Sequence, residues 1–380
     1  MLYFDHNATT PLLPQAKQAW VEAAEQFIGN PSSPHRSGAR ADAALEGARE
    51  QLAAFLGCDA MDIVWTSGAT ESNNMIFRHL NAALASDAEA LVSAVEHPSV
   101  LAAAGQWLGK RVRPISVERS GVVALEWLEQ ELSRRRVRAV AIMAANNETG
   151  VIQPWREARA LCRRWEVPLA CDGTQWIGKL PALGLGECDF VSGSAHKFGG
   201  PRGGGFLKCP SGRPLTPLLV GGSQEEGRRA GTENVPGVLA MLAALTARES
   251  ALAAGEHQAR APWRDTFERG LLEALPGTEI VGARAKRLWN TVSALMPEAD
   301  CRLRWVVKLD KAGCAVSTGS ACASGREEPS PVLAAMGFSP AEAGRALRFS
   351  SGWETTPEDW TRLLAGVRAA HESMMKTKKS

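Results

Sequence analysis

The sequence lacks the features of several large classes of protein. Its eight cysteines form no C-x-x-C pair and no Cys/His spacing typical of a zinc site, so no metal is expected. Its 43 basic and 41 acidic residues nearly cancel, so we expect no binding to nucleic acid or to an acidic membrane surface. No apolar run approaches the roughly 20 residues that span a bilayer, and residues 1–10 have no charged stretch followed by an apolar one. These absences predict a cytoplasmic protein that acts on a small molecule.

The length and the hydrophobic pattern predict two domains of unequal size. The chain has 380 residues, which exceeds one small module. From about residue 38, helical and strand patterns alternate, as is typical of an α/β domain with a largely parallel sheet. The strands predicted there are 63–66, 91–95, 140–144, 167–171 and 190–192. After roughly residue 258 the predicted elements are a helix at 267–275, a strand at 291–296, a helix ending near Gly313 and a final helix after Pro357.

The segment Ser67–Ser72 follows a predicted strand and opens a helical pattern. Ligands of open α/β sheets gather at the carboxyl ends of the strands. The backbone N–H groups and hydroxyls of this segment could therefore hold a phosphate at the helix N-terminus. The alternative is an ordinary helix N-cap.

Two further strand ends carry a lysine and a carboxylate. Lys197 follows the apolar strand at 190–192 and a run of hydroxyl and imidazole groups, so a cleft could lower its pKa and favour Schiff-base formation. The alternative for a lone lysine is a solvated surface charge. Asp172 closes the strand at 167–171, where a carboxylate could pair with a protonated pyridine nitrogen. Its alternative is a cap for the turn at Thr174.

Ten segments in order make the chain resemble the cysteine desulfurases, a branch of the class V aminotransferases. The resemblance covers nearly the whole chain. The segments are Asp5–Thr10, Gly29–Ser33, Ser67–Ser72, Glu96–His97, Asn146–Gly150, Asp172–Gln175, Ser194–Lys197, Arg229–Asn234, and Gly319–Cys322 with Arg348–Ser350. The resemblance implies the fold of pyridoxal-phosphate transferases of the aspartate aminotransferase type (fold type I). This fold has a large, mostly parallel seven-stranded domain and a smaller α+β domain.

The resemblance also implies a role for each matching residue. Lys197 would bind pyridoxal 5'-phosphate covalently, and Asp172 would pair with its pyridinium nitrogen. His97 would stack on the ring and transfer protons as a second catalytic residue, although a histidine before Pro98 could instead cap a turn. The other implied cofactor contacts are Ala69, Thr70, Asn147, Gln175, Ser194, His196 and, from the second subunit of a homodimer, Thr232. The implied substrate contacts are Arg348, Asn7 and Asn147.

Cys322 lies in a run of small polar residues, 316–325, followed by Pro329 and Pro331. Such a run buries little apolar surface, so its thiol should be accessible to solvent. The other cysteines lie mainly in apolar or strand contexts. The resemblance makes Cys322 the third catalytic residue, the nucleophile that takes sulfur from the substrate. Arg348 has two possible interpretations. It could recognise the carboxylate of an amino-acid substrate, or it could form an ion pair at the surface.

These observations predict a cysteine desulfurase that converts L-cysteine to L-alanine and carries the sulfur as a persulfide. The sulfur would pass to an acceptor such as an iron–sulfur scaffold protein, or serve thiolation. The alternatives are a selenocysteine lyase and a class V aminotransferase, and a scaffold that lost its chemistry is disfavoured because every expected catalytic residue is present. The predicted domains are residues 12–258, which bind the cofactor, and residues 1–11 with 259–380, which carry Cys322.

Overall fold

The computed structural model describes residues 1–212, 214–298, 302–318 and 330–377. In this part of the chain, the largest sheet has seven strands in the order β2-β8-β7-β6-β5-β3-β4. Strand β8 is antiparallel to β2 and β7, and the other neighbouring pairs are parallel. The prediction of a mostly parallel seven-stranded sheet is therefore confirmed. Its strands are β2 (Ile63–Thr66), β3 (Glu89–Ser93), β4 (Val112–Ile115), β5 (Val137–Ala141), β6 (Leu169–Asp172), β7 (Phe190–Ser194) and β8 (Gly205–Lys208).

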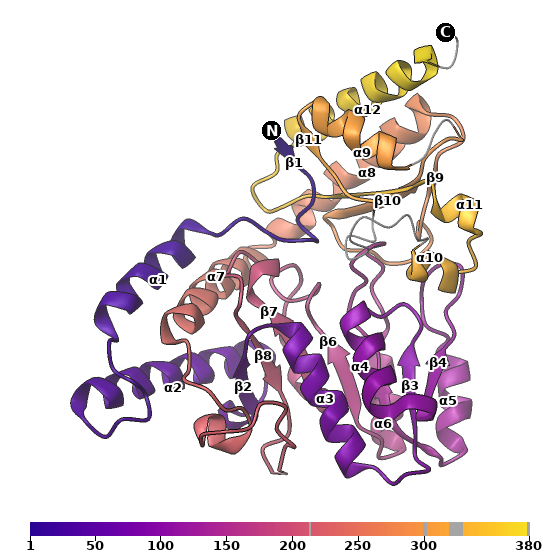
Figure 1. The fold of residues 1–380 in the computed structure, drawn as a ribbon. Coiled ribbons are helices and arrows are strands. Elements are labelled where there is room, and N and C mark those ends of the chain that lie inside the picture. The colour runs from indigo at the N-terminus through magenta and orange to yellow at the C-terminus, as the bar shows by residue number, and fades with distance from the viewer. Residues whose placement is uncertain (213, 299–301, 319–329, 378–380) are drawn as a thin grey trace.

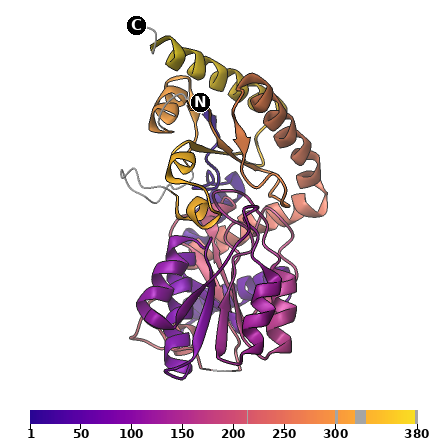
Figure 2. The same ribbon diagram turned by 90° about the vertical axis from the view of Figure 1, so that its right-hand side faces the viewer.

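Helices cover both faces of this sheet, as Figure 2 shows. Side chains of α3 and α4 pack with one face in a cluster that includes Phe77 and Val92. Side chains of α2, α5, α6 and α7 pack with the other face, around Leu52 and Val191. Burial on both faces explains why the central strands read as apolar runs. These helices are α1 (Pro14–Gln26), α2 (Arg36–Leu56), α3 (Ala69–Ala83), α4 (Pro98–Leu108), α5 (Leu125–Ser133), α6 (Trp155–Arg164) and α7 (Val235–Ala253).

A second layer of structure with its own core lies above the sheet in Figure 1. It contains an antiparallel sheet of order β12-β10-β9 and a parallel pair of β1 with β11. The first residues of the chain therefore join its last third. The elements are β1 (Leu2–Tyr3), β9 (Glu279–Ile280), β10 (Thr291–Leu295), β11 (Cys314–Ala315), β12 (Ala346–Ser350), α8 (Glu256–Ala274), α9 (Arg302–Lys311), α10 (Pro331–Ala335), α11 (Pro340–Ala343) and α12 (Pro357–Thr377). The predicted bounds of the two domains stay a prediction.

Helix α7 is the one described helix whose length and apolar composition would suit a membrane span. Just over half of the tested window is buried inside the molecule. The helix packs against α1 and α2, and its side chains belong to the large apolar core. A core helix of this kind passes the same test, so the finding is weak support for a membrane segment.

Candidate active site

A cavity of about 450 Å³ lies where the parallel strands of the large sheet end. All of these strands except β8 run in the same direction, so the segments after β2, β3, β5, β6 and β7 meet at one edge of the sheet. The structure brings nine of the predicted cofactor residues to the wall of this cavity. They are Ala69, Thr70, His97, Asn147, Asp172, Gln175, Ser194, His196 and Lys197.

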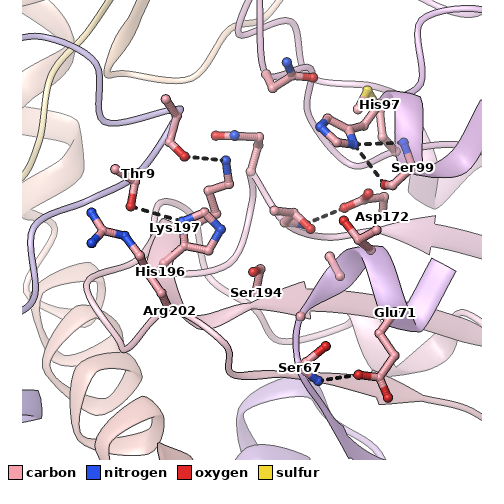
Figure 3. Close-up of a pocket in the computed structure, with 18 of the residues that line it drawn as sticks. Thr9, Ser67, Glu71, His97, Ser99, Asp172, Ser194, His196, Lys197 and Arg202 are labelled. Carbon is pink, nitrogen blue, oxygen red and sulfur yellow. Dashed lines mark hydrogen bonds between the residues drawn. The ribbon is translucent and has the colours of Figure 1, made fainter. Parts of the chain in front are cut away.

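Lys197 ends a short 3-10 helix, Ala195–Lys197, directly after strand β7. Its ammonium Nζ donates hydrogen bonds of 2.8 Å to the carbonyl oxygens of Asn7 and Ala8. The side chain is half-buried, and Figure 3 shows it reaching into the cavity opposite His97 and Asp172. The chain therefore holds this amine at the cavity wall rather than in open solvent.

Asp172 is the last residue of β6, and each of its carboxylate oxygens has a defined partner. Oδ1 accepts the backbone N–H of Thr174 at 2.9 Å. Oδ2 accepts the side-chain amide of Asn73 at 3.0 Å. The capping role and the place on the cavity wall, posed as alternatives from the sequence, therefore occur together. The two bonds fix the carboxylate in position while it faces the cavity.

His97 is the N-cap of α4, and its ring also lines the cavity. The ring atom Nδ1 accepts the backbone N–H of Ser99 at 3.1 Å, and it lies 2.8 Å from the Ser99 hydroxyl. Burial lowers the pKa of His97, with Lys197 acting in the same direction and Asp172 opposing it. The neutral ring that results carries its proton on Nε2, because Nδ1 is the acceptor.

Glu96, the neighbour of His97, is buried behind the cavity. Its Oε1 accepts the backbone N–H of Met143 at 2.6 Å. Burial and the carboxylate of Asp172 raise the pKa of Glu96 well above its usual range, against the bond from Met143. The surroundings of Glu96 therefore disfavour its ionised form.

The start of α3 and the two residues before it place the side chains of Ser67 and Thr70 at the cavity. Gly68 is the N-cap of α3, and no side chain makes a capping hydrogen bond there. The ordinary N-cap predicted as the alternative is therefore absent. Ser67 and Thr70 line the cavity and are exposed. Because the first backbone N–H groups of a helix have no partner within the helix, this edge is suited to binding an anion.

Ser194 and His196 line the cavity next to this edge. The ring of His196 approaches the Thr9 hydroxyl through Nδ1 at 3.1 Å. Burial lowers the pKa of His196 to about 4, with further lowering by the positive charges of Lys197 and Arg202. His196 can therefore offer hydrogen bonds to a ligand at pH 7, but no positive charge.

Gln175 and Asn147 belong to a buried hydrogen-bond network that reaches Asn7. Gln175 donates through Nε2 to the carbonyl oxygen of Asn7 at 2.9 Å and accepts from Lys179 Nζ at 2.5 Å. Burial lowers the pKa of Lys179 well below its usual range, and Lys197 and Arg348 add to this effect. Asn7 is buried and donates from its side chain to the Asn147 carbonyl at 3.1 Å. Its own side chain therefore lies behind the cavity wall.

The sequence alone predicts a short strand at 346–347 with Arg348 at its end, but in the structure Arg348 lies in the middle of β12. The strand continues to Ser350 because it pairs with β10 along its length. The guanidinium is buried, donates to Asp5 Oδ1 at 2.7 Å, and donates to the Asn147 carbonyl at 2.9 Å. An ion pair is thus present, but it is internal. A substrate carboxylate would share this guanidinium with Asp5.

Of the predicted residues that the structure describes, Asn7, Arg348 and Thr232 are not among those that line the cavity. Thr232 is exposed and lines a smaller neighbouring cavity together with Ser67 and Gly203. Cys322 lies outside the described residues, so its role stays a prediction. Six of its seven companions are described; five are buried and Cys58 is half-buried.

The cavity wall also contains residues that were not singled out from the sequence. Thr9 and Glu71 fall inside the quoted segments, so their position in the motif was a usable signal. Arg202 follows Gly199, Gly200 and Pro201, and only its position on the cavity wall indicates a functional role. Lys179, which anchors Gln175, resembles any other lysine in the sequence.

Comparison with known proteins places this site in a family. The protein family described as "Aminotransferase class-V" matches residues 2–363 of the chain. A cysteine desulfurase of Cereibacter sphaeroides is 40% identical over 368 residues, 96% of this chain and 94% of that protein. The X-ray structure of a NifS-like protein from Rickettsia africae is 30% identical with a TM-score of 0.87, covering 98% of this chain and 99% of that one.

A solved structure titled "SspA in complex with cysteine" is also similar. It is 27% identical with a TM-score of 0.78, and the match covers 92% of this chain and 98% of that one. In each of these comparisons the similarity covers almost the full length of both proteins, so no large part of this chain lies outside the common fold. The chain therefore belongs to the class V aminotransferase family and, within it, to the cysteine desulfurases.

Proposed function

We propose that this protein is a pyridoxal-phosphate enzyme that removes sulfur from L-cysteine and releases L-alanine. The observation that carries the proposal is the meeting of Lys197, Asp172 and His97 around one cavity. These side chains come from three strand ends spread over 101 residues, from 97 to 197. Two relatives that match more than nine-tenths of this chain in sequence are cysteine desulfurases.

The residues present fit the cofactor. Two buried polar atoms of cavity residues, Asn147 Oδ1 and Thr174 Oγ1, have no hydrogen-bond partner in the described part of the chain. Such atoms are costly unless a ligand or water satisfies them. Gly68 brings the backbone close to the cavity at a φ of 147°, and an added Cβ would stand 3.3 Å from the Ser194 hydroxyl. The cavity thus offers oxygen atoms that lack a partner in the described residues, together with an amine and a carboxylate.

Each end of the cavity suits one part of the cofactor. Hydroxyls of Thr70 and Ser194, with the imidazole of His196, would hold the phosphate. Lys197 would hold the aldehyde carbon, and Asp172 would keep the ring nitrogen protonated. Bound in this way, the cofactor supplies an electron sink for the pair left when the substrate α-proton departs.

The side chains around the cavity then handle protons and orientation. Lys197 would accept the α-proton of the substrate, because its amine projects into the cavity from the wall. His97 would present Nε2–H to the cavity, since Ser99 occupies Nδ1. Arg348 would orient the substrate carboxylate from behind the Asn147 carbonyl.

Cys322 would complete the reaction as the nucleophile. Its thiolate attacks the sulfur of the substrate, a sulfur–sulfur bond forms, and the bond between the substrate β-carbon and sulfur breaks. The electron pair stays with the β-carbon, which takes up a proton and becomes the methyl group of alanine. The enzyme keeps the sulfur as a persulfide. We further propose that a sulfur-acceptor protein, such as an iron–sulfur scaffold, receives it.

The reaction is tested by incubating purified protein with L-cysteine and measuring alanine, sulfide after reduction, and keto acid. We expect equal amounts of alanine and releasable sulfur, with no keto acid. Keto acid in place of sulfide would favour the class V aminotransferase reading. Release of selenium from selenocysteine, without release of sulfur from L-cysteine, would favour a selenocysteine lyase.

We also propose a homodimer in which Thr232 of each subunit contacts the phosphate in the other subunit's site. The support is that Thr232 is exposed and stands beside the main cavity without lining it. Losing one hydroxyl bond to a charged phosphate corresponds to about 1.5–3 kcal/mol. We therefore expect Thr232→Ala alone to weaken cofactor binding by about 10- to 100-fold.

Mixed dimers test this arrangement. One subunit carries Lys197→Ala and the other Thr232→Ala, so one of the two sites keeps both residues if the sites are shared. We expect about half of the wild-type activity per dimer at a cofactor concentration that saturates the wild type but leaves the Thr232→Ala homodimer largely without cofactor. A control mixture pairs Lys197→Ala with a chain that carries both changes, and it should be inactive. Equal inactivity of both mixtures, in dimers verified by mass, would contradict the shared site.

A further inference from the structure

A carboxylate stands at the edge of the cavity that is suited to phosphate. Glu71 is in the first turn of α3 and lines the cavity together with Ser67 and Thr70. Its side chain is only 9% exposed. Glu71 Oε2 accepts the backbone N–H of Ser67 at 2.8 Å, so a ligand cannot use that donor. A buried carboxylate in this position repels a phosphate dianion unless another group cancels its charge.

Arg229 supplies the opposing charge from a distant part of the sequence. It follows the 3-10 helix Gln224–Gly227, and 158 residues separate it from Glu71. Its Nε donates to Glu71 Oε1 at 2.9 Å, and a second nitrogen donates to Oε2 at 3.4 Å. In the described part of the chain, Arg229 is the one cation that forms an ion pair with Glu71.

The charge of Glu71 is fixed by these contacts. Burial acts to raise the pKa of Glu71, but the hydrogen bonds from Arg229 and Ser67 outweigh it, and the pKa is lowered. The carboxylate is therefore ionised at pH 7. His196 adds no positive charge nearby, since its pKa is about 4. Among the described residues, the lysine and arginine side chains on the cavity wall are Lys197 and Arg202, and Arg229 lines the smaller neighbouring cavity.

We propose that Arg229 is a positioning residue for the cofactor phosphate. Its positive charge cancels the negative charge of Glu71, so that the phosphate can occupy the N-terminal edge of α3. This inference rests on the proposed function, because it concerns the same cofactor. The competing explanation is that the pair only ties the loop of Arg229 to α3. The two explanations differ in what they predict for a ligand without a phosphate.

The test measures the dissociation constants of pyridoxal 5'-phosphate and of pyridoxal for the full chain freed of cofactor, by absorbance titration. Both ligands carry the aldehyde that reacts with Lys197, and only one carries the charge. Arg229→Met should weaken binding of the phosphorylated ligand by roughly 10- to 100-fold, as expected for one unscreened charge at a partly buried site. Binding of pyridoxal should change by less than about twofold.

A second change on the same chain separates electrostatics from a structural tie. Glu71→Gln added to Arg229→Met should restore the affinity for pyridoxal 5'-phosphate to near the wild-type value, because no carboxylate is left uncompensated. Arg229→Lys should keep most of the affinity. The control is Arg164→Met, which removes an exposed arginine from its ion pair with Glu129. It should affect neither ligand.

Each outcome decides the question. Equal weakening of both ligands, or no recovery in the double variant, would overturn the role of Arg229 while leaving the proposed function intact. Unchanged binding of both ligands by Arg229→Met would overturn it as well. A wild-type protein that bound neither ligand would overturn the proposed function itself, and this inference with it.

Discussion

Replacing Lys197 with alanine should reduce alanine production from L-cysteine by at least about 10³-fold. The expected loss is large because one side chain holds the cofactor and also accepts the α-proton. Help from a general base alone is commonly worth about 10²- to 10⁴-fold. The amine is already placed for both tasks, since two carbonyl oxygens hold it at the cavity wall, each at 2.8 Å.

The assignment can be checked without relying on activity. Purified wild-type protein should be yellow, and borohydride reduction followed by peptide mass spectrometry should find the cofactor on Lys197. Added methylamine should partly restore α-proton removal in Lys197→Ala, because a free amine can enter the vacated space. The control is Lys110→Ala, an exposed lysine on the 3-10 helix Gly109–Arg111, which should keep full activity. Cofactor label on another lysine would refute the assignment.

From the sequence it could be predicted that the residues after the strands meet at one edge of the sheet. The residue at which each strand ends could not be predicted in every case. The prediction of 63–66 matches β2. The prediction of 140–144 runs three residues past β5, which ends at Ala141. Ile142, Met143 and Ala144 are buried although they follow the strand, and Met143 lines the cavity. A buried apolar run cannot by itself separate a strand from the segment that shapes a site.

Strand β8 was not predicted, and close packing of glycines explains why. It begins at Gly205, after a glycine-rich stretch that weakens any strand pattern. A Cβ at Gly205 would lie 2.5 Å from Gly68 Cα. The glycine that obscures the strand in the sequence is thus required for β8 to approach the segment before α3.

Long-range pairs explain what else the sequence could not provide. Glu71 meets Arg229 across 158 residues, and Asp5 meets Arg348 across 343. No local pattern marks such pairs, because both partners resemble ordinary surface charges. In contrast, the capping and cavity roles of His97 and Asp172 were both visible. The sequence offers these roles as alternatives, because it does not show that a side chain can use one atom for the cap and another for the cavity.

Replacing Cys322 with alanine should stop the reaction at a later stage than Lys197→Ala does. If Cys322 acts only after the α-proton has left, the variant should still bind the cofactor and L-cysteine. It should also exchange the substrate α-proton with solvent deuterium at a rate close to that of the wild type, because Lys197 is unchanged. It should form no persulfide and produce at least about 10³-fold less alanine, since the sulfur has no nucleophile to attack it.

The control for Cys322→Ala is Cys58→Ala, because Cys58 is the most exposed of the described cysteines. Burial raises the pKa of Cys58 to about 11, so little thiolate is present at pH 7, and its removal should leave alanine production unchanged. Combining Cys322→Ala with Lys197→Ala should reproduce the lysine variant, because residues that act in series do not have additive effects. Deuterium exchange separates the two single variants, since only the chain that keeps Lys197 should show it. Full alanine production by Cys322→Ala without an added thiol would remove Cys322 from the mechanism. A simple elimination of sulfide, or a selenocysteine lyase, would then describe the site better.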